Sequence, residues 1–313
     1  MRVIIVGLGN QGKKRQTVAG RDVVATVDPA TPGADYVSVL DVPLDSFDAA
    51  LVCTPDAAKA ETLEYLLSRG KHSLVEKPLL GSGRGTLERL AELARQRGVA
   101  CYTAYNHRFE PNIVRLKEAL DSGALGRVYW TRLFYGNGTA ANVKGTWRDQ
   151  GLGVLADLGS HLLDLVLFLL GPSVAPFQVW GLYRHENHAY DHVAFGSSGD
   201  VAIEAEASLL SWKNTFAIDV IGETGSAHVN GLMKWGTSTL TVRKRVFPSG
   251  VPLEQVTASN GPDPTWEAEY QHFKTLCVSG GNTIEKDVWI ASALEAIAAS
   301  AAEPANGRKR RVV

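Results

Sequence analysis

The chain has 313 residues, of which 45% are hydrophobic and 21% are charged. This composition is that of an ordinary globular protein, and the length suits two domains of about 150 residues each, which excludes disordered, fibrous and coiled-coil chains. The 32 Lys and Arg residues are balanced by 33 Asp and Glu, a net charge of −1. We expect neither nucleic acid nor membrane as a partner, because there is no general basic field to attract phosphates.

The cysteines and the apolar segments predict a cytoplasmic protein. Cys53, Cys101 and Cys277 are odd in number and far apart, so they form neither a disulfide framework nor a metal-ligand pattern. The opening apolar run, 3–6, is too short for a secretion signal. The longest apolar stretch, 162–170, falls well short of the ~20 residues that a membrane-spanning helix needs.

Short β-branched runs alternate with helical segments over the first hundred residues. Strands are predicted at 3–6, 23–27, 49–53, 73–76 and 99–102, and helices at 57–69 and 86–97. This alternation predicts a parallel, doubly wound Rossmann sheet in an α/β fold. A further helix at 115–121 leads into Ser122-Gly123-Ala124-Leu125-Gly126, a predicted hinge. The sequence therefore predicts a first domain, built on this sheet, over 1–122.

The second predicted domain, 123–313, has a different pattern. A strand at 128–135 and a helix at 155–170 precede a long run of β segments from 177 to 247, including 201–209, 215–221 and 239–246. Helices at 266–278 and 285–300 close the chain, or pack back on the first domain. The order predicts an α+β substrate domain with a large, mostly antiparallel open sheet. Because one face of that sheet would be uncovered, we expect a homodimer or homotetramer.

A glycine motif follows the first predicted strand. Gly7-Leu8-Gly9-Asn10-Gln11-Gly12 has the spacing at which glycines allow a tight turn and backbone amides approach a pyrophosphate. Asp28 closes the second strand, where an acid hydrogen-bonds the ribose hydroxyls and repels a 2′-phosphate, so NAD is favoured. Lys13, Lys14 and Arg15 leave NADP open, since they could neutralise that phosphate; a solvated first helical turn is the plainer explanation.

Further motifs appear in order along the chain: Val52-Cys53-Thr54-Pro55-Asp56, Gly70-Lys71-His72-Ser73-Leu74-Val75-Glu76-Lys77-Pro78, Tyr105-Asn106-His107-Arg108-Phe109-Glu110-Pro111, Trp147-Arg148, and Gly153-Val154-Leu155-Ala156-Asp157-Leu158-Gly159-Ser160-His161. Together they resemble the Gfo/Idh/MocA family of glucose-fructose oxidoreductase and inositol 2-dehydrogenase, over essentially the whole chain. The resemblance implies an NAD(P)-dependent oxidoreductase. Such an enzyme transfers a hydride between nicotinamide and a secondary alcohol or ketone of a sugar, cyclitol or sugar derivative.

The resemblance assigns three catalytic residues: Lys77, Asp157 and His161. In support, Asp157 and His161 are four residues apart, so both face the same way if a helix has begun there. Lys77 follows a parallel strand at the sheet edge where open α/β sheets bind ligands. His161 would take the hydroxyl proton, Lys77 would stabilise the developing alkoxide, and Asp157 would bind a substrate hydroxyl or orient the histidine.

The resemblance also assigns cofactor-binding residues beyond the glycine motif and Asp28: Thr54, Pro55, Glu76, Lys77, Asn106, Trp147 and Arg148. Asn106 would lie near the nicotinamide, and Trp147 and Arg148 would line the cofactor or substrate side or be structural. Glu76 is either a cofactor contact or a structural hydrogen-bonding residue. No metal is predicted, because Asp157 and His161 have no evident third ligand.

Two other functions remain open for such a chain: a redox-neutral glycoside hydrolase that retains its nicotinamide, and a non-catalytic dinucleotide sensor. The complete Lys, Asp and His set counts against the sensor. The substrate itself is not predicted, because specificity resides in loops such as 183–191 and 211–214.

Three segments depart from the pattern of the family: 13–22, 29–47, and Gly151-Leu152-Gly153-Val154, where the family commonly has consecutive glycines. Residues 13–22 leave room for barely two helical turns, and 29–47 is too short and Pro-rich for the usual next helix. The basic tail, 308–311, has the composition of a nucleic-acid or targeting patch. Its terminal position in a chain of net charge −1 favours a solvated end or an edge strand.

Overall fold

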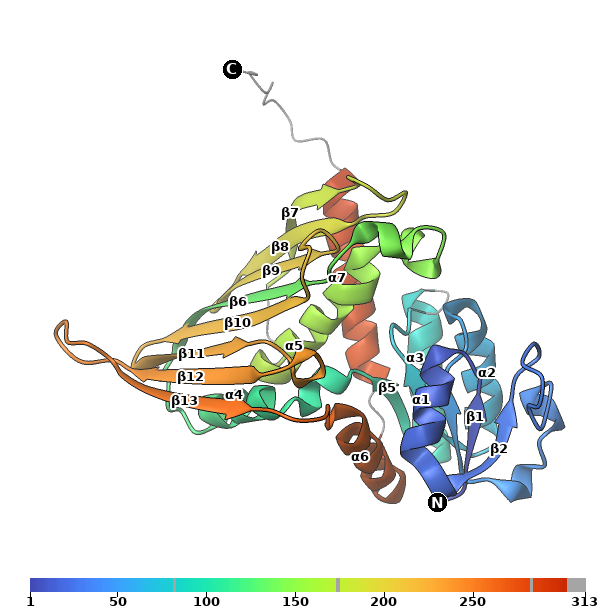
Figure 1. Ribbon diagram of the computed structural model, residues 1–313. Coiled ribbons are helices and arrows are strands. Elements are labelled where there is room, and N and C mark those ends of the chain that lie inside the picture. Colours follow the sequence, from blue (N-terminus) through green and yellow to red (C-terminus); the bar gives the residue numbers. More distant parts are fainter. Residues whose placement is uncertain (81–82, 173–174, 282–283, 303–313) are drawn as a thin grey trace. The chain divides into compact units, whose positions relative to one another are not determined.

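The computed structural model describes residues 1–80, 83–172, 175–281 and 284–302 (Figure 1). The described residues fall into two compact units, one within 1–114 and 260–291 and one within 115–259 and 292–302. The sequence placed one boundary after residue 122, whereas the first unit ends earlier and regains residues 260–291 from the far end of the chain. The basic tail lies outside the described residues.

The first unit is built on a five-stranded parallel sheet with the order β2-β1-β3-β4-β5. Its strands are β1 (Val3–Val6), β2 (Val23–Val27), β3 (Ala49–Val52), β4 (His72–Glu76) and β5 (Cys101–Ala104). Every residue of β1 and β3 is buried, as expected for central strands covered on both faces. The predicted doubly wound sheet is confirmed.

Helices cover both faces of this sheet: α1 (Asn10–Ala19), α2 (Asp56–Ser68), α3 (Arg84–Arg97), α6 (Thr265–Ser279) and the first part of α7 (Ile284–Ala302). The boundary between the units falls within α4 (Pro111–Asp121) and within α7. One apolar layer is formed with Leu63 and Leu87 of α2 and α3. The other is formed with Ala19 of α1 and Phe273 of α6. Between β2 and β3 the backbone forms only short 3-10 turns, at Val39–Asp41 and Leu44–Ser46, so the usual helix is missing there as predicted.

Strand β5 begins two residues later than predicted. Gly98 adopts a left-handed conformation, φ 62°, at the end of α3, and the Val99 N–H donates to the Ala94 carbonyl at 3.0 Å. Val99 is therefore part of the helix C-cap rather than of the strand.

The second unit contains an eight-stranded sheet with the order β13-β12-β11-β10-β6-β9-β8-β7. The strands are β6 (Val128–Gly136), β7 (Gln178–Tyr183), β8 (His192–Ser198), β9 (Ala202–Ser208), β10 (Thr215–Gly222), β11 (Gly225–Asn230), β12 (Ser238–Lys244) and β13 (Leu253–Ser259). All neighbours are antiparallel except β6 and β9. The predicted open sheet is confirmed, and β13 extends it beyond the predicted β region.

The inner face of this sheet packs on α5 (Ser160–Leu170), which a π-helical turn, Leu155–Gly159, precedes. Buried residues alternate along the strands, as with Leu133 on β6 and Ile218 on β10, which is the period of a half-covered sheet. Figure 1 shows α5 and the end of α7 on this side. The opposite face is lined by exposed side chains. No helix among the described residues is long and apolar enough to cross a membrane.

Candidate active site

The glycine loop of the first unit has the backbone shape that a dinucleotide requires. Gly7 has φ +95°, and a Cβ on Gly12 would lie 1.8 Å from the Gly7 carbonyl oxygen. A Cβ on Gly9 would meet nothing within 4 Å, and no side chain caps α1 at this residue. The N-terminus of α1 thus has open space beside Gly9 and no side-chain cap, and the loop fits a pyrophosphate.

Asp28 supports this loop from the end of β2. Its Oδ2 accepts the Leu8 N–H at 2.7 Å, and its Oδ1 accepts the amides of Ala30 and Thr31, each at 2.8 Å. These backbone hydrogen bonds hold the pKa of Asp28 below its ordinary value. The carboxylate is therefore charged at neutral pH. These three amides occupy most of the about four acceptor positions of a carboxylate, so a ribose hydroxyl would use the remaining one.

Arg15 is not available to a phosphate. It is 1% exposed, its Nε contacts Glu76 Oε1 at 2.7 Å, and its Nη2 contacts Glu269 Oε2 at 2.6 Å. Lys13 and Lys14 are exposed, as expected for a solvated first helical turn, whereas Arg15 is buried. The sequence left two roles open for Glu76, a cofactor contact or a structural hydrogen bond. In the structure Glu76 accepts a hydrogen bond from Arg15.

The carboxyl ends of the parallel strands gather several predicted residues at one edge of the first unit. A Cβ on Gly7 would lie 2.9 Å from the Cys53 carbonyl, so the loops after β1 and β3 are adjacent. Thr54 and Pro55 follow β3, Lys77 follows β4, and Asn106 follows β5, its amide nitrogen donating to Thr265 Oγ1 at 2.7 Å.

The second unit holds Asp157 and His161 in its interior. Asp157 is 1% exposed in the π-helical turn, and His161 is 5% exposed at the start of α5. Arg148 Nε lies 3.1 Å from Asp157 Oδ2, and its guanidinium lies near the exposed Trp147 ring. Such π-turns inside helices are frequent at functional sites. Asp157 and His161 thus lie in one helical segment, and Arg148 forms an ion pair with Asp157.

Two residues that the sequence analysis missed lie beside this pair. The buried Tyr135 ring of β6 is 5.8 Å from the His161 ring, and Lys234 Nζ donates to the Tyr135 hydroxyl at 2.9 Å. Burial, together with the negative charge of Asp157, raises the pKa of Tyr135 far above its ordinary value. The phenol therefore stays protonated and keeps a proton to donate. An inward position on an alternating strand marks Tyr135, but nothing in the sequence marks Lys234.

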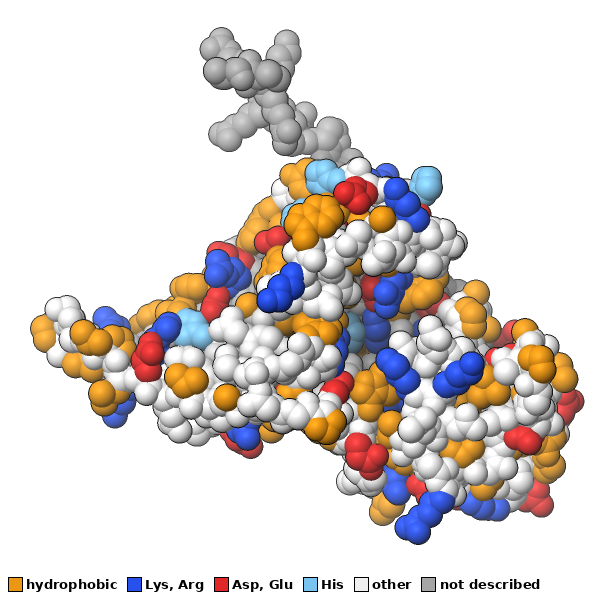
Figure 2. All heavy atoms as spheres, viewed as in Figure 1, with side chains coloured by type: hydrophobic (Ala, Val, Ile, Leu, Met, Phe, Trp, Pro, Cys, Tyr) orange, Lys and Arg blue, Asp and Glu red, His pale blue; other side chains and the backbone are white. Residues whose placement is uncertain are grey.

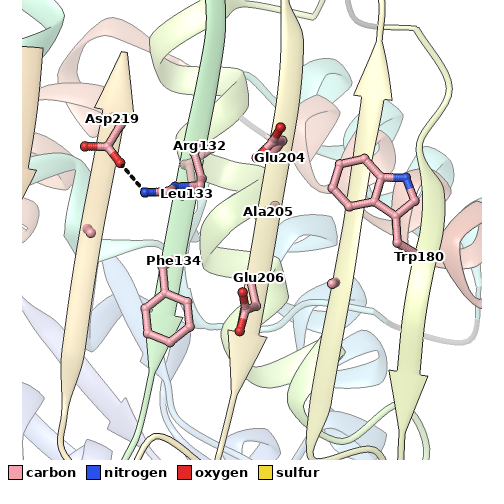
Figure 3. A pocket seen from close by; sticks show the side chains of 10 residues that line it. Arg132, Leu133, Phe134, Trp180, Glu204, Ala205, Glu206 and Asp219 are labelled. Atoms are coloured by element: carbon pink, nitrogen blue, oxygen red, sulfur yellow. Dashed lines mark hydrogen bonds and ion pairs between the residues drawn. The ribbon is translucent and has the colours of Figure 1, made fainter. Parts of the chain in front are cut away.

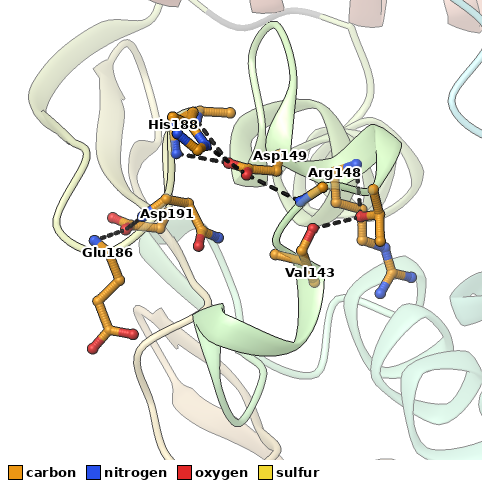
Figure 4. A network of polar contacts seen from close by, with 10 residues as sticks. Val143, Arg148, Asp149, Glu186, His188 and Asp191 are labelled. Atoms are coloured by element: carbon orange, nitrogen blue, oxygen red, sulfur yellow. Dashed lines mark hydrogen bonds and ion pairs between the residues drawn. The ribbon is translucent and has the colours of Figure 1, made fainter.

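A network of buried carboxylates fixes the loop next to Arg148 (Figure 4). Asp149 accepts the amides of His188 and Ala189 at 2.7 and 3.1 Å and contacts His188 Nδ1 at 3.0 Å. These hydrogen bonds, that of the His188 ring first, hold the pKa of Asp149 well below its usual range. Asp191 accepts the amides of three successive residues: His185, Glu186 and Asn187. The predicted specificity loop is therefore held against the segment that carries Arg148.

Gly153 completes this arrangement. It has φ +52°, and a Cβ there would lie 2.3 Å from the Tyr190 carbonyl oxygen, which accepts the Val154 N–H at 2.7 Å. Only glycine allows the loop to approach the start of the Asp157 segment this closely.

Comparison with known families identifies the chain. Residues 1–105 match the model described as "Oxidoreductase family, NAD-binding Rossmann fold", and residues 113–228 match the "GFO/IDH/MocA C-terminal domain". The chain belongs to the GFO/IDH/MocA family. It is an NAD(P)-dependent oxidoreductase, as the motifs predicted.

Relatives of known activity include scyllo-inositol 2-dehydrogenase (NAD(+)) of Bacillus subtilis (strain 168), 26% identical over 90% of this chain and 87% of the relative. The levoglucosan dehydrogenase of Pseudarthrobacter phenanthrenivorans is 27% identical, but over only 44% of this chain and 36% of that protein. The structure of levoglucosan dehydrogenase with NADH and levoglucosan superposes with a TM-score of 0.84 at 19% identity, covering 96% of this chain and 97% of the other. These relatives are dehydrogenases, not glycoside hydrolases or regulators.

Proposed function

We propose that this oxidoreductase converts a secondary alcohol of a sugar, a cyclitol or a sugar derivative to the ketone, or the reverse, with NAD. The observation that carries the proposal is the buried pair of Asp157 and His161 beside Tyr135 and Arg148. A histidine so placed can exchange a proton with a hydroxyl near neutral pH. The relatives named above, which act on an inositol and on levoglucosan, support the class of substrate.

When bound at the glycine loop, NAD supplies the hydride acceptor. The protein residues do the rest. His161 takes the hydroxyl proton, Asp157 accepts a hydrogen bond from the substrate or holds the histidine, and Lys77 stabilises the negative charge that develops on the oxygen. The Tyr135 phenol, oriented by Lys234, is a further donor for a neighbouring hydroxyl. The proposal requires Lys77 and His161 to act on the same hydroxyl.

The test is a spectrophotometric screen. The purified chain with NAD is expected to produce the nicotinamide absorbance band with at least one member of a panel of inositols, anhydrosugars, free sugars and sugar nucleotides. Release of free sugar from a glycoside without any net absorbance change would instead indicate the redox-neutral hydrolase. Dinucleotide binding with neither reaction across the panel would contradict the proposal.

Asp28 should make the chain prefer NAD. We expect NADH to bind at least about tenfold more tightly than NADPH, equivalent to about 1.4 kcal/mol, because the charged carboxylate accepts ribose hydroxyls and repels a 2′-phosphate. Titration by nicotinamide fluorescence measures both affinities. Asp28→Asn should lower the ratio of the Kd for NADPH to the Kd for NADH.

The matched control for Asp28 is Asp35→Asn. Asp35 also accepts a backbone N–H, that of Thr26 at 2.8 Å, and its pKa is likewise lowered by hydrogen bonds, but it is not at the end of β2. Asp35→Asn should leave the ratio unchanged. Tighter binding of NADPH to the wild type would show that Lys13 or Lys14 outweighs Asp28.

We further propose that the chain is a homo-oligomer that uses the uncovered face of the eight-stranded sheet. This face is hollowed between the side chains shown in Figure 3. The face carries aromatic and charged side chains side by side and is not a continuous apolar surface. Trp180 is 57% exposed and Phe134 is partly exposed, while Arg132 pairs with Asp219 at 3.0 Å. Aromatic residues and arginine are enriched in protein interfaces, and Trp180, Phe134 and Arg132 are of these types.

The hairpin between β12 and β13 adds exposed apolar side chains: Val246, Phe247, Val251 and Leu253. This hairpin is at the left in Figure 1, and hydrophobic side chains are visible at the same end in Figure 2. An exposed group of this size at the end of a long hairpin favours contact with a second copy.

Light scattering at micromolar concentration should give a dimer or tetramer mass. Trp180→Glu should shift the mass toward the monomer, since it buries a charge in the proposed contact. Val278→Glu is the control, because Val278 is 91% exposed on α6 of the other unit. A monomeric wild type would contradict the proposal, and so would dissociation of both variants or of neither.

A further inference from the structure

The segment that carries Lys77 lies just beyond the hydrogen-bonded part of β4. The pairing of β4 with β5 ends at Glu76, opposite Ala104, and its pairing with β3 ends at Val75. Lys77 and Pro78 are therefore not positioned by the sheet ladder. A lysine side chain has four rotatable carbons, so the path of its backbone decides where its ammonium can reach.

One buried cation holds the residue before Lys77. Arg15 of α1 donates from Nε to Glu76 Oε1 at 2.7 Å and from Nη2 to Glu269 Oε2 at 2.6 Å. Its guanidinium lies 4.2 Å from the centre of the Trp266 ring. Both Arg15 and Glu269 are at most 1% exposed. The planar guanidinium thus holds the Glu76 side chain by one charged hydrogen bond, and Glu269 and the Trp266 ring hold the guanidinium in place.

A second buried cation holds the residue after Lys77. Lys59 of α2 is 3% exposed, and its Nζ donates to the Pro78 carbonyl oxygen at 2.7 Å. Its charge is balanced by Asp56, whose Oδ1 lies 3.4 Å away. Burial lowers the pKa of Lys59, while the carboxylate of Asp56 opposes this effect. A buried ammonium is costly unless it is paired and hydrogen-bonded, and here both conditions are met at the turn that follows Lys77.

We propose that Arg15 and Lys59 are positioning residues for Lys77, acting through Glu76 on one side and Pro78 on the other. The inference rests on the proposed catalytic role of Lys77. This role explains why Arg15 and Lys59 are buried, although charged residues on the outer helices of a domain are ordinarily exposed. Since a displacement of about 1 Å in a reacting group can cost about 10²-fold in rate, a clamp on both neighbours has a direct effect on turnover.

The two cations should differ in one respect. Arg15 belongs to α1, the helix that begins at the glycine loop. Through its hydrogen bond to Glu76 it therefore connects the Lys77 turn with the proposed pyrophosphate site. Lys59 belongs to α2 and contacts the Lys77 turn. Changes at Lys59 should therefore alter turnover alone, whereas changes at Arg15 should alter turnover and coenzyme affinity together.

The experiment compares Lys59→Met with Lys71→Met. Lys71 makes the same kind of bond in the same unit, from its Nζ to the Phe47 carbonyl at 2.8 Å. We expect Lys59→Met to lower kcat by about 10- to 100-fold, with the Kd for NADH within about twofold of wild type. Lys59→Arg, which keeps a charged donor, should recover most of the loss, and Lys71→Met should leave both values unchanged.

Arg15→Lys tests the other side of the turn. Arg15→Met would leave two buried carboxylates unpaired and could fail to fold, whereas a lysine keeps the charge but cannot serve both carboxylates with a planar fork. We expect a lower kcat and a weaker affinity for NADH. Wild-type values for both would overturn the role of Arg15.

A readout that does not depend on activity separates this inference from the proposed function. Hydrogen exchange of the peptide that contains Lys77 to Leu79 should be faster in Lys59→Met than in wild type, and unchanged in Lys71→Met. Faster exchange together with a Lys77→Met variant of normal turnover would mean that the clamp exists but Lys77 is not catalytic. Unchanged exchange, or a wild-type kcat in Lys59→Met while Lys77→Met is inactive, would overturn the inference.

Discussion

His161→Asn is expected to lower kcat by roughly 10²- to 10⁴-fold, the usual effect of a positioned general base. His161 is buried in α5 beside Tyr135, and asparagine keeps a polar side chain of similar reach without a basic nitrogen. The affinity for NADH should change little, because the dinucleotide is assigned to the glycine loop and Asp28. Steady-state kinetics with a substrate from the screen, together with NADH fluorescence, measure both quantities.

The pH profile adds a second criterion for His161. An imidazole titrates near neutral pH, so alcohol oxidation by the wild type should fall at acidic pH as the base becomes protonated. This acidic limb should disappear in His161→Asn. If His161→Asn kept both the normal turnover and the fall in rate at acidic pH, His161 would be a packing residue of α5. The proton would then have to pass to Lys77 or to water.

Lys77→Met is expected to lower kcat by about 10²- to 10³-fold, the range measured when one preorganised donor to a developing oxyanion is removed. Methionine has a similar length and no charge, so the change tests the ammonium and not the volume. The backbone should keep its path, because Glu76 and Pro78 are held by Arg15 and Lys59. Binding of NADH should be nearly unchanged.

The sharpest comparison for Lys77 is with Lys59→Met. Removing the ammonium itself should cost more than displacing it, so the Lys77 variant should be the slower of the two. Methylamine added to Lys77→Met should restore part of the rate if the missing group is a cation at the hydroxyl. Full activity of both Lys77→Met and His161→Asn would mean that the active site is elsewhere.

The dinucleotide-binding end of this fold could be predicted from local sequence. The strand that runs into Gly7–Gly12 and the acid at Asp28 depend on backbone conformations that only a few residue types allow. The alternation of short apolar runs with helical segments likewise predicted the order of elements in the first unit, and the long β region predicted the open sheet. These features depend on residues close together in the chain.

Contacts between distant residues decided the rest. Arg15 follows two solvated lysines in the sequence, yet it is buried because Glu76 and Glu269 approach it from positions 61 and 254 residues away. Lys234 reaches Tyr135 across 99 residues. A charged side chain is buried only where a partner offsets its loss of hydration. That partner is brought by the tertiary fold, so no local pattern of residues could have predicted it.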